Sequence, residues 1–296
     1  MNPQVLCIGV ITVDTIALVD KYPSADDRVI AEEIVRAGGG PAAVASVALA
    51  RLGVSSAIAG TIGNDADGDY VLDIFKREGV NTEGITRTST PTGGAVIVAS
   101  REYSARAIST RQPIHQAPLN DRAKAIASKA DWVHVDHVGV HQLKGAGIVR
   151  GSRPKISFDA GYDVENFDVT IVDLFAPNDK SLLSRHPGKS FEEALTIDAE
   201  KGASLVVATQ GSVGSAGYSA QTGLVKAPSF KTEIVSTLGA GDVFHGALLA
   251  QLIQGFALQE AIRRANAVAA LSCRGLDGQS AIPTTSELNT YLSGVK

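Results

Sequence analysis

The most informative stretch of this chain reads TLGAGDVF over residues 237–244. Two glycines flank an alanine, and an apolar run over residues 243–252, which is typical of a helix, follows at once. Glycine lets backbone N–H groups approach a ligand closely, and the start of a helix adds unpaired N–H groups and the positive end of the helix dipole. Gly239, Ala240 and Gly241 are therefore predicted to form an anion-binding cradle.

Asp242 lies at the edge of this predicted cradle, where its carboxylate can accept the proton of a hydroxyl group. Aspartate is also common at the start of a helix, where it caps backbone N–H groups. On this segment alone both interpretations of Asp242 stay open.

Upstream, a second glycine cluster reads TQGSVG over residues 209–214 and follows a predicted strand over residues 205–209. Such a turn can bind phosphate or a nucleotide, with Thr209, Gly211 and Gly214 as candidate residues, and an ordinary tight turn is the alternative. The cluster is neither a Walker A motif nor a dinucleotide-binding fingerprint, because the Gly-Lys-Ser/Thr sequence and the G-x-G-x-x-G spacing are both missing.

A third glycine cluster, residues 38–40, precedes a helix predicted over residues 42–52, and Asp14 follows the first predicted strand. Gly39 and Gly40 are predicted to let the backbone approach a ligand closely. Tight packing of the helix against a sheet is the alternative.

Strands and helices alternate along most of the chain. Strands are predicted over residues 5–10, 56–60, 93–100, 132–135, 156–159, 171–175 and 205–209, and helices over residues 42–52, 69–78, 191–201, 243–252 and 258–272. The alternation predicts an α/β fold in which a parallel sheet is covered on both faces and ligands bind beyond the carboxyl ends of its strands. Residues 12–36 and 90–110 do not fit the alternation, and we expect them to form a small subsidiary sheet of exposed strands over the site.

Composition narrows the class of protein. The 296 residues carry a net charge of −4 without a run of basic residues, which argues against a nucleic-acid partner. The beginning of the chain lacks the basic segment of a signal peptide, no stretch reads as a membrane span, and the two cysteines do not make a disulfide framework. We therefore expect a cytoplasmic protein without a membrane partner. The spacing of His134, His137 and His141 does not suit a metal site, so no protein-bound metal site is predicted.

Taken together, the three glycine clusters resemble those of the ribokinase-like (PfkB) carbohydrate kinase family, and the resemblance spans residues 5–283. It includes ALARLG at residues 48–53, GNDADG at residues 63–68 and, most specifically, GAGDVF at residues 239–244. Within the family, residues 5–23 are similar to ketohexokinases, whereas residues 38–43 and 239–248 are similar to bacterial sulfofructose kinases.

This resemblance implies a ribokinase-like three-layer sandwich with a mostly parallel central sheet and a small β-sheet lid. Residues 1–11, 37–89 and 111–296 would form the large domain that binds nucleotide and substrate, and residues 12–36 and 90–110 would form the lid. The resemblance also implies transfer of the γ-phosphoryl group of ATP, with Mg²⁺, to a hydroxymethyl group of a sugar. A homodimer formed through the lid is a further expectation.

The resemblance also assigns roles to individual residues. Asp242 matches the catalytic base, and Gly239, Ala240 and Gly241 match the anion hole. Asp14, Gly39 and Gly40 match residues that contact the sugar, and Thr209, Gly211 and Gly214 match the nucleotide turn. Two further residues match the cofactor site. Asn178 begins the family's Asn-x-x-Glu segment, and Asn266 matches a residue beside the adenine.

Four positions depart from the family's pattern. Val44 replaces an Asn that helps to hold sugar hydroxyls, and a valine side chain cannot form a hydrogen bond. Ser181 replaces the Glu that is tied to organising magnesium, although Asp179 is a possible substitute. Leu238 replaces a Thr, as in ketohexokinases, and Ser236 replaces an Asp that helps to hold an activating potassium ion. We therefore expect weak or no potassium dependence.

The sequence is thus best interpreted as that of an ATP-dependent sugar kinase acting on a fructose-like ketose. The alternatives are a kinase for an anionic sugar derivative such as sulfofructose or a sugar phosphate, a nucleoside kinase, and a catalytically weak protein that binds sugar or nucleotide. Arg28 and Arg111 are candidate anion-binding residues or solvated surface charges. Val44 and His137 are candidate specificity residues, and His137 can equally be a core or surface residue.

Overall fold

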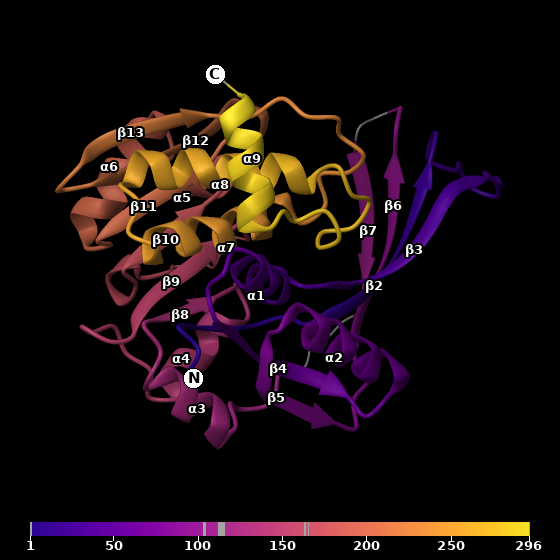
Figure 1. The fold of residues 1–296 in the computed structure, drawn as a ribbon, viewed down its shortest axis with the longest axis horizontal. Coiled ribbons are helices and arrows are strands. Elements are labelled where there is room, and N and C mark those ends of the chain that lie inside the picture. Colours follow the sequence, from indigo (N-terminus) through magenta and orange to yellow (C-terminus); the bar gives the residue numbers. More distant parts are fainter. Residues whose placement is uncertain (1, 103–104, 112–115, 163, 165, 296) are drawn as a thin grey trace.

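The computed structural model describes residues 2–102, 105–111, 116–162, 164 and 166–295, which fold around two β-sheets (Figure 1). The larger sheet has the strand order β13-β12-β11-β10-β9-β8-β1-β4-β5. It is parallel from β11 to β5, whereas β12 and β13 are antiparallel additions at one edge. Its strands are β1 (Val5–Ile8), β4 (Ser56–Gly63), β5 (Asn81–Thr88), β8 (Trp132–Val135), β9 (Lys155–Ala160), β10 (Leu174–Pro177), β11 (Leu205–Thr209), β12 (Gly214–Ser219) and β13 (Gly223–Pro228).

Helices cover both faces of this sheet because successive residues of a buried strand point to opposite sides. On β1, Val5 and Cys7 belong to one hydrophobic cluster, and Leu6 and Ile8 belong to the other. The first cluster packs under α1 (Pro41–Arg51), α2 (Ala66–Glu78), α7 (Ala240–Ile253), α8 (Leu258–Ser272) and α9 (Thr285–Gly294). The second packs under α3 (Asp121–Ala127), α4 (Gln142–Gly145), α5 (Asp179–Arg185) and α6 (Phe191–Lys201).

The smaller sheet has the order β3-β2-β6-β7 and extends away from the helices on one side of the molecule (Figure 1). Its strands are β2 (Thr12–Val19), β3 (Ala31–Gly39), β6 (Gly93–Ser100) and β7 (Ala105–Thr110). We call this four-stranded sheet the lid. The lid and the three layers around the central sheet confirm the predicted α/β architecture, and the exact division into two domains stays a prediction.

Three predictions of secondary structure were wrong in part. The apolar run 171–175 is not one strand, because Asp168 accepts the Thr170 N–H and starts a 3₁₀ turn, η2 (Val169–Ile171), before β10 begins at Leu174. The strands predicted as exposed within residues 12–36 include one that is buried, because β2 lies between β3 and β6 and buries Ile16 and Leu18, whereas much of β3 is exposed. Helix α2 begins three residues earlier than predicted, where the Asp65 side chain accepts the Gly68 N–H.

Two further 3₁₀ turns, η1 (Gly139–His141) and η3 (Gly211–Val213), connect elements beyond the carboxyl ends of β8 and β11. Within the described residues, no helix combines the length and apolar character needed to cross a membrane.

Candidate active site

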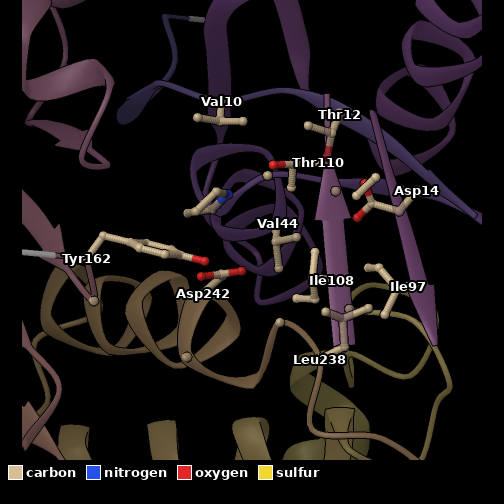
Figure 2. A pocket seen from close by; sticks show the side chains of 18 of the residues that line it. Val10, Thr12, Asp14, Val44, Ile97, Ile108, Thr110, Tyr162, Leu238 and Asp242 are labelled. Carbon is tan, nitrogen blue, oxygen red and sulfur yellow. The ribbon is translucent and has the colours of Figure 1, made fainter. Parts of the chain in front are cut away.

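A cavity of about 520 Å³ lies between the carboxyl ends of the parallel strands and the lid (Figure 2). Residues at or just beyond the ends of β8, β9, β10 and β11 line one side, and β2, β6 and β7 of the lid line the other. The start of α7 closes it from below in the view of Figure 2. The cavity therefore occupies the position at which open α/β sheets bind their ligands.

The start of α7 presents free backbone N–H groups to this cavity. Gly239 has φ of 72°, and a side chain there would place its Cβ 2.8 Å from the Gly278 Cα, so glycine is required on both counts. Within the part of the chain that the structure describes, the N–H groups of Gly241 and Asp242 have no recorded acceptor, as expected for the first turn of a helix. A Cβ at Gly241 would meet no protein atom within 4 Å, which leaves room for a ligand.

Asp242 does not act as the helix cap, because Gly239 is the N-cap residue and α7 has no side-chain cap. Its half-buried side chain instead points into the cavity (Figure 2). Burial raises the pKa of Asp242 well above its usual value, the nearby carboxylates of Asp159 and Asp136 raise it further, and the Arg106 guanidinium lowers it. This carboxylate therefore holds a proton more readily than an exposed aspartate, as suits a general base.

Asp159, at the end of β9, faces the cavity beside His245 on α7. The Asp159 Oδ1 lies 3.4 Å from the His245 Nε2 and accepts the Gly161 N–H at 2.9 Å. Both side chains are almost fully buried, with exposed fractions of 5% and 4%. A second buried imidazole, His134, lies beyond His245 with the ring centroids 6.3 Å apart, and its Nδ1 contacts the Ser157 Oγ at 3.1 Å.

The lid supplies a carboxylate of its own. Asp14 on β2 is buried beside Gly39, and its Oδ1 has no hydrogen-bond partner among the described residues. Burial raises the pKa of Asp14 to about 6, against a smaller lowering by the Thr12 side chain. A buried polar atom without a partner is costly, so a ligand hydroxyl that donates to Asp14 would be bound favourably. Gly40 adopts φ of 97°, and any side chain there would collide with the Val10 carbonyl.

The opposite end of the cavity holds Thr209 and Asn178, which lie at the ends of β11 and β10 and form an isolated bridge. The Asn178 side chain accepts the Ser181 N–H and donates to the Gly161 carbonyl, which fixes the turn that enters α5. The rings of His137 and Tyr162 pack here in a tilted arrangement, with centroids 4.7 Å apart and an interplanar angle of 40°.

The structure brings most of the predicted site residues together around this cavity. Those that line it are Asp14, Gly39, Gly40, Val44, Arg111, His137, Asn178, Thr209, Gly239, Gly241 and Asp242. Their predicted roles stay predictions, but their convergence from distant parts of the sequence indicates one site.

Five predicted residues do not line the cavity. Arg28 is exposed in the loop between β2 and β3, so its predicted contact with a ligand anion is not supported. Ala240 lies within the first turn of α7. Gly211 is exposed in η3, whereas Gly214 is buried where β12 meets β13. Asn266 is buried. Its Oδ1 accepts from the Ser215 hydroxyl and its Nδ2 donates to two backbone carbonyls, which favours a structural role.

Several lining residues were missed by sequence reasoning, namely Asp159, Tyr162, His245, Ile97, Ile108 and Arg106. A period-two pattern in residues 106–110 could have identified the last two, because Arg106, Ile108 and Thr110 share one face of β7. Asp179, the suggested substitute for the missing Glu, is not among the lining residues, because its carboxylate accepts the Lys180 N–H at the start of α5.

Comparison with known proteins identifies the class of this site. The sequence model "pfkB family carbohydrate kinase" matches residues 2–150 and 167–285. The chain is 27% identical over 301 residues to a ribokinase of Lactococcus lactis, covering 98% of this chain and 97% of that protein, and 26% identical to the ketohexokinase of Mus musculus, covering 93% and 98%. The crystal structure of a "putative Ribokinase II" of E. coli in complex with ATP and Mg²⁺ superimposes with a TM-score of 0.85 at 25% identity, covering 99% of each chain.

Proposed function

Because this chain belongs to the pfkB family of carbohydrate kinases, we propose that it transfers the γ-phosphoryl group of ATP to a hydroxymethyl group of a fructose-like ketose. The observation that carries the proposal is the position of Asp242, whose carboxylate faces the cavity at the start of α7, across from Asp14 on the lid. A base, a source of positive dipole and a hydroxyl-binding carboxylate meet there, as phosphoryl transfer to an alcohol requires.

The residues have distinct roles in this proposal. Asp14 and the backbone at Gly39 and Gly40 hold sugar hydroxyls, and Asp242 takes the proton of the attacking hydroxyl group. The free N–H groups at Gly241 and Asp242 stabilise the negative charge that develops on the transferred group. Thr209 and Asn178 lie toward the nucleotide.

Mg²⁺ fits this site through Asp159. Protein-bound Mg²⁺ prefers oxygen ligands and is ordinarily held by one or two carboxylates together with substrate phosphates. Asp159 is a buried carboxylate that faces the cavity, and Asn178 lies near it across Gly161. When bound with ATP, the ion would neutralise phosphate charge, and Asp159 would serve in place of the Glu that Ser181 replaces.

The preference for a ketose rests on two sequence features, the segment over residues 5–23 and Leu238, both of which resemble ketohexokinases. The test is a coupled assay of ADP release over ketoses, aldoses, sugar phosphates, sulfosugars and nucleosides. Transfer to a ketose with the highest kcat/KM supports the proposal, and higher kcat/KM with an aldose or nucleoside overturns the ketose assignment. Tight binding of ATP and sugar without ADP release would instead support the alternative of a catalytically weak binding protein.

A second candidate substrate, an anionic sugar derivative, is favoured by one observation. Arg106 and Arg111 both line the cavity, and none of the salt bridges among the described residues includes either side chain. Arg106 donates to the Thr237 hydroxyl and Arg111 to the Thr92 carbonyl, so both are held near the site by neutral partners. In the same assay, higher kcat/KM with a sulfosugar or sugar phosphate than with the neutral ketose would support this candidate.

The outer face of the lid suits pairing with a second copy of this chain. Ile34 and Val96 are 67% and 59% exposed and lie on the face opposite the cavity, because their neighbours Val35 and Ile97 point inward. Homodimerisation through the lid would cover them. Light scattering after size-exclusion chromatography tests this part of the proposal, since the double variant Ile34→Lys and Val96→Lys should be monomeric where the parent protein is dimeric.

A further inference from the structure

The part of the cavity under the middle of the lid is lined by aliphatic side chains. Ile16, Ile97 and Ile108 are register partners on β2, β6 and β7, so they form one row across the inner face of the lid. Leu238 packs against the cluster that contains Ile16 and Ile97, and Val44 approaches the same space from α1 (Figure 2). We call these five side chains the aliphatic wall.

A row with polar side chains at its two ends lies beside this wall. Asp14, Ala95 and Thr110 are register partners two residues away along the same strands, and Asp14 and Thr110 can form hydrogen bonds with hydroxyls. Neighbouring positions on one face of a strand are about 7 Å apart. A sugar that contacts Asp14 therefore extends over the aliphatic wall, where no side chain of the wall offers a hydrogen bond.

The aliphatic wall is incompletely covered in the structure. Ile16 and Ile97 are 0% and 2% exposed, whereas Ile108 is 45% exposed and Leu238 is half-buried. Because removal of apolar surface from water is favourable, an apolar group of the ligand would be bound where it covers Ile108. Val44, which replaces the family's Asn, adds an apolar side chain across the cavity from the lid.

A hydroxyl group placed against this wall would lose its water without gaining a partner among the five wall side chains. The penalty for such an unpaired group corresponds to a loss of roughly five- to a hundredfold in binding. A methylene or methyl group in the same position loses nothing and gains contacts. The wall therefore discriminates against an oxygen at the carbon that faces it.

We infer that the acceptor is a deoxygenated sugar, with a methyl or methylene carbon that covers Ile108 while its hydroxyls face Asp14. This inference rests on the proposed function and specifies the substrate class of the same site. It concerns only the carbon at the aliphatic wall and leaves the transferred phosphoryl group on a hydroxymethyl carbon near Asp242.

Matched pairs of sugars test the inference. The first set is D-fructose with its 1-, 3-, 4- and 6-deoxy analogues, and the second is D-ribose with its 2- and 3-deoxy analogues; every analogue retains a hydroxymethyl group. We expect at least one analogue to have a kcat/KM about tenfold or more above its parent. If every parent sugar is phosphorylated as well as or better than its analogues, the inference is wrong while the proposed function stands. If no sugar in either set accepts phosphate, both fall.

Two variants locate the effect. Val44→Thr keeps the size and branching of the side chain and adds a hydroxyl, and Ile108→Thr keeps the branching and replaces the ethyl group by a hydroxyl. Each variant should reduce the preference for the deoxy analogue by about threefold or more. Ile30→Thr is the matched control, because Ile30 is 91% exposed next to the lid and does not line the cavity. Circular dichroism and melting temperature establish that each variant folds. An unchanged preference in both folded wall variants would overturn the assignment to the aliphatic wall.

Discussion

At the scale of single residues, the position of Asp242 sets the clearest expectation. Asp242→Asn preserves the shape of the side chain but removes the proton acceptor, so turnover should fall by roughly 10²–10⁴. ATP affinity should change little, because the backbone N–H groups at the start of α7 remain. Steady-state kcat and the Kd for ATP, measured by calorimetry, check both halves. A variant with nearly normal kcat would remove Asp242 from the role of base.

The charge of Arg106 should set the pH at which Asp242 works. Burial and neighbouring carboxylates raise the pKa of Asp242, and Arg106 opposes them. Replacement of this cation in Arg106→Met leaves the increase unopposed, so a higher pH is needed to deprotonate the base. The acidic limb of the kcat/KM profile should therefore move to higher pH.

Arg122→Met is the control for this profile, because Arg122 is exposed on α3 and does not line the cavity. Its acidic limb should coincide with that of the parent protein. A limb that stays in place in Arg106→Met, with activity still measurable, would show that the cation does not act on the base.

At the scale of elements, two glycines of α7 should respond in opposite ways to the same substitution. Gly241→Ala adds a methyl group that meets no protein atom, so stability should be retained while the KM for ATP rises through obstruction of the N–H groups. In Gly246→Ala the new Cβ would lie 2.5 Å from the Ala45 carbonyl oxygen on α1, so stability should fall. Melting temperature and KM, measured on both variants, separate the two effects. Equal loss of stability in the two would contradict this distinction.

We expect the loop that enters α7 to bind potassium weakly or not at all. The Ser236 Oγ accepts the Leu238 N–H at 3.1 Å, so one of its lone pairs is already engaged, and a hydroxyl brings no charge to a cation. We expect kcat/KM with potassium chloride to match that with a tetraalkylammonium salt at equal ionic strength. Specific activation of about tenfold or more would refute this, and Ser236→Asp should create or increase activation.

The same elements show how much of the fold and of the site could be predicted from the sequence. Apolar runs predicted most of the buried strands, and the glycines near Asp14 and Asp242 predicted two sides of the site, because several glycine clusters in one chain are a more specific signal than any one of them. The alternation of Arg106, Ile108 and Thr110 could have indicated that these residues share one face of a strand. That this face is turned toward the cavity depends on the pairing of β7 with β6 and on closure over a distant helix, which no local pattern predicts. Asp159 lacked a motif of its own, and only the alignment of strand ends places it beside His245.

At the scale of the whole molecule, the buried His134 should make stability depend on pH. Burial lowers the pKa of His134 to about 4, with a further lowering by His245 and an opposing increase by Asp159. Between about pH 6.5 and 4 the unfolded chain binds this proton and the folded chain does not, so the free energy of unfolding falls as the pH falls through that window. From pH 7 to pH 5 the loss attributable to this residue should be about 2 kcal/mol.

His134→Gln removes this titration and keeps an amide that can contact Ser157. Urea denaturation at pH 7 and pH 5 should therefore show a smaller loss of stability in this variant than in the parent protein. His141→Gln is the control, because His141 is exposed and its replacement should leave the pH dependence unchanged. Identical pH dependence in His134→Gln and the parent would exclude His134 as its source.

The parallel pairing of β2 with β6 also determines the order in which the molecule can assemble during translation. Thr12 pairs with Gly93 and Val19 with Ser100, residues about 80 positions apart. At ordinary ribosomal rates, roughly 4–16 seconds separate their synthesis. Once β3 is complete at Gly39, the hairpin of β2 and β3 waits through the rest of that interval with one strand edge unpaired and with Ile16 and Leu18 uncovered, a surface that favours aggregation. The first 40 residues would therefore offer a target to a chaperone at the exit tunnel.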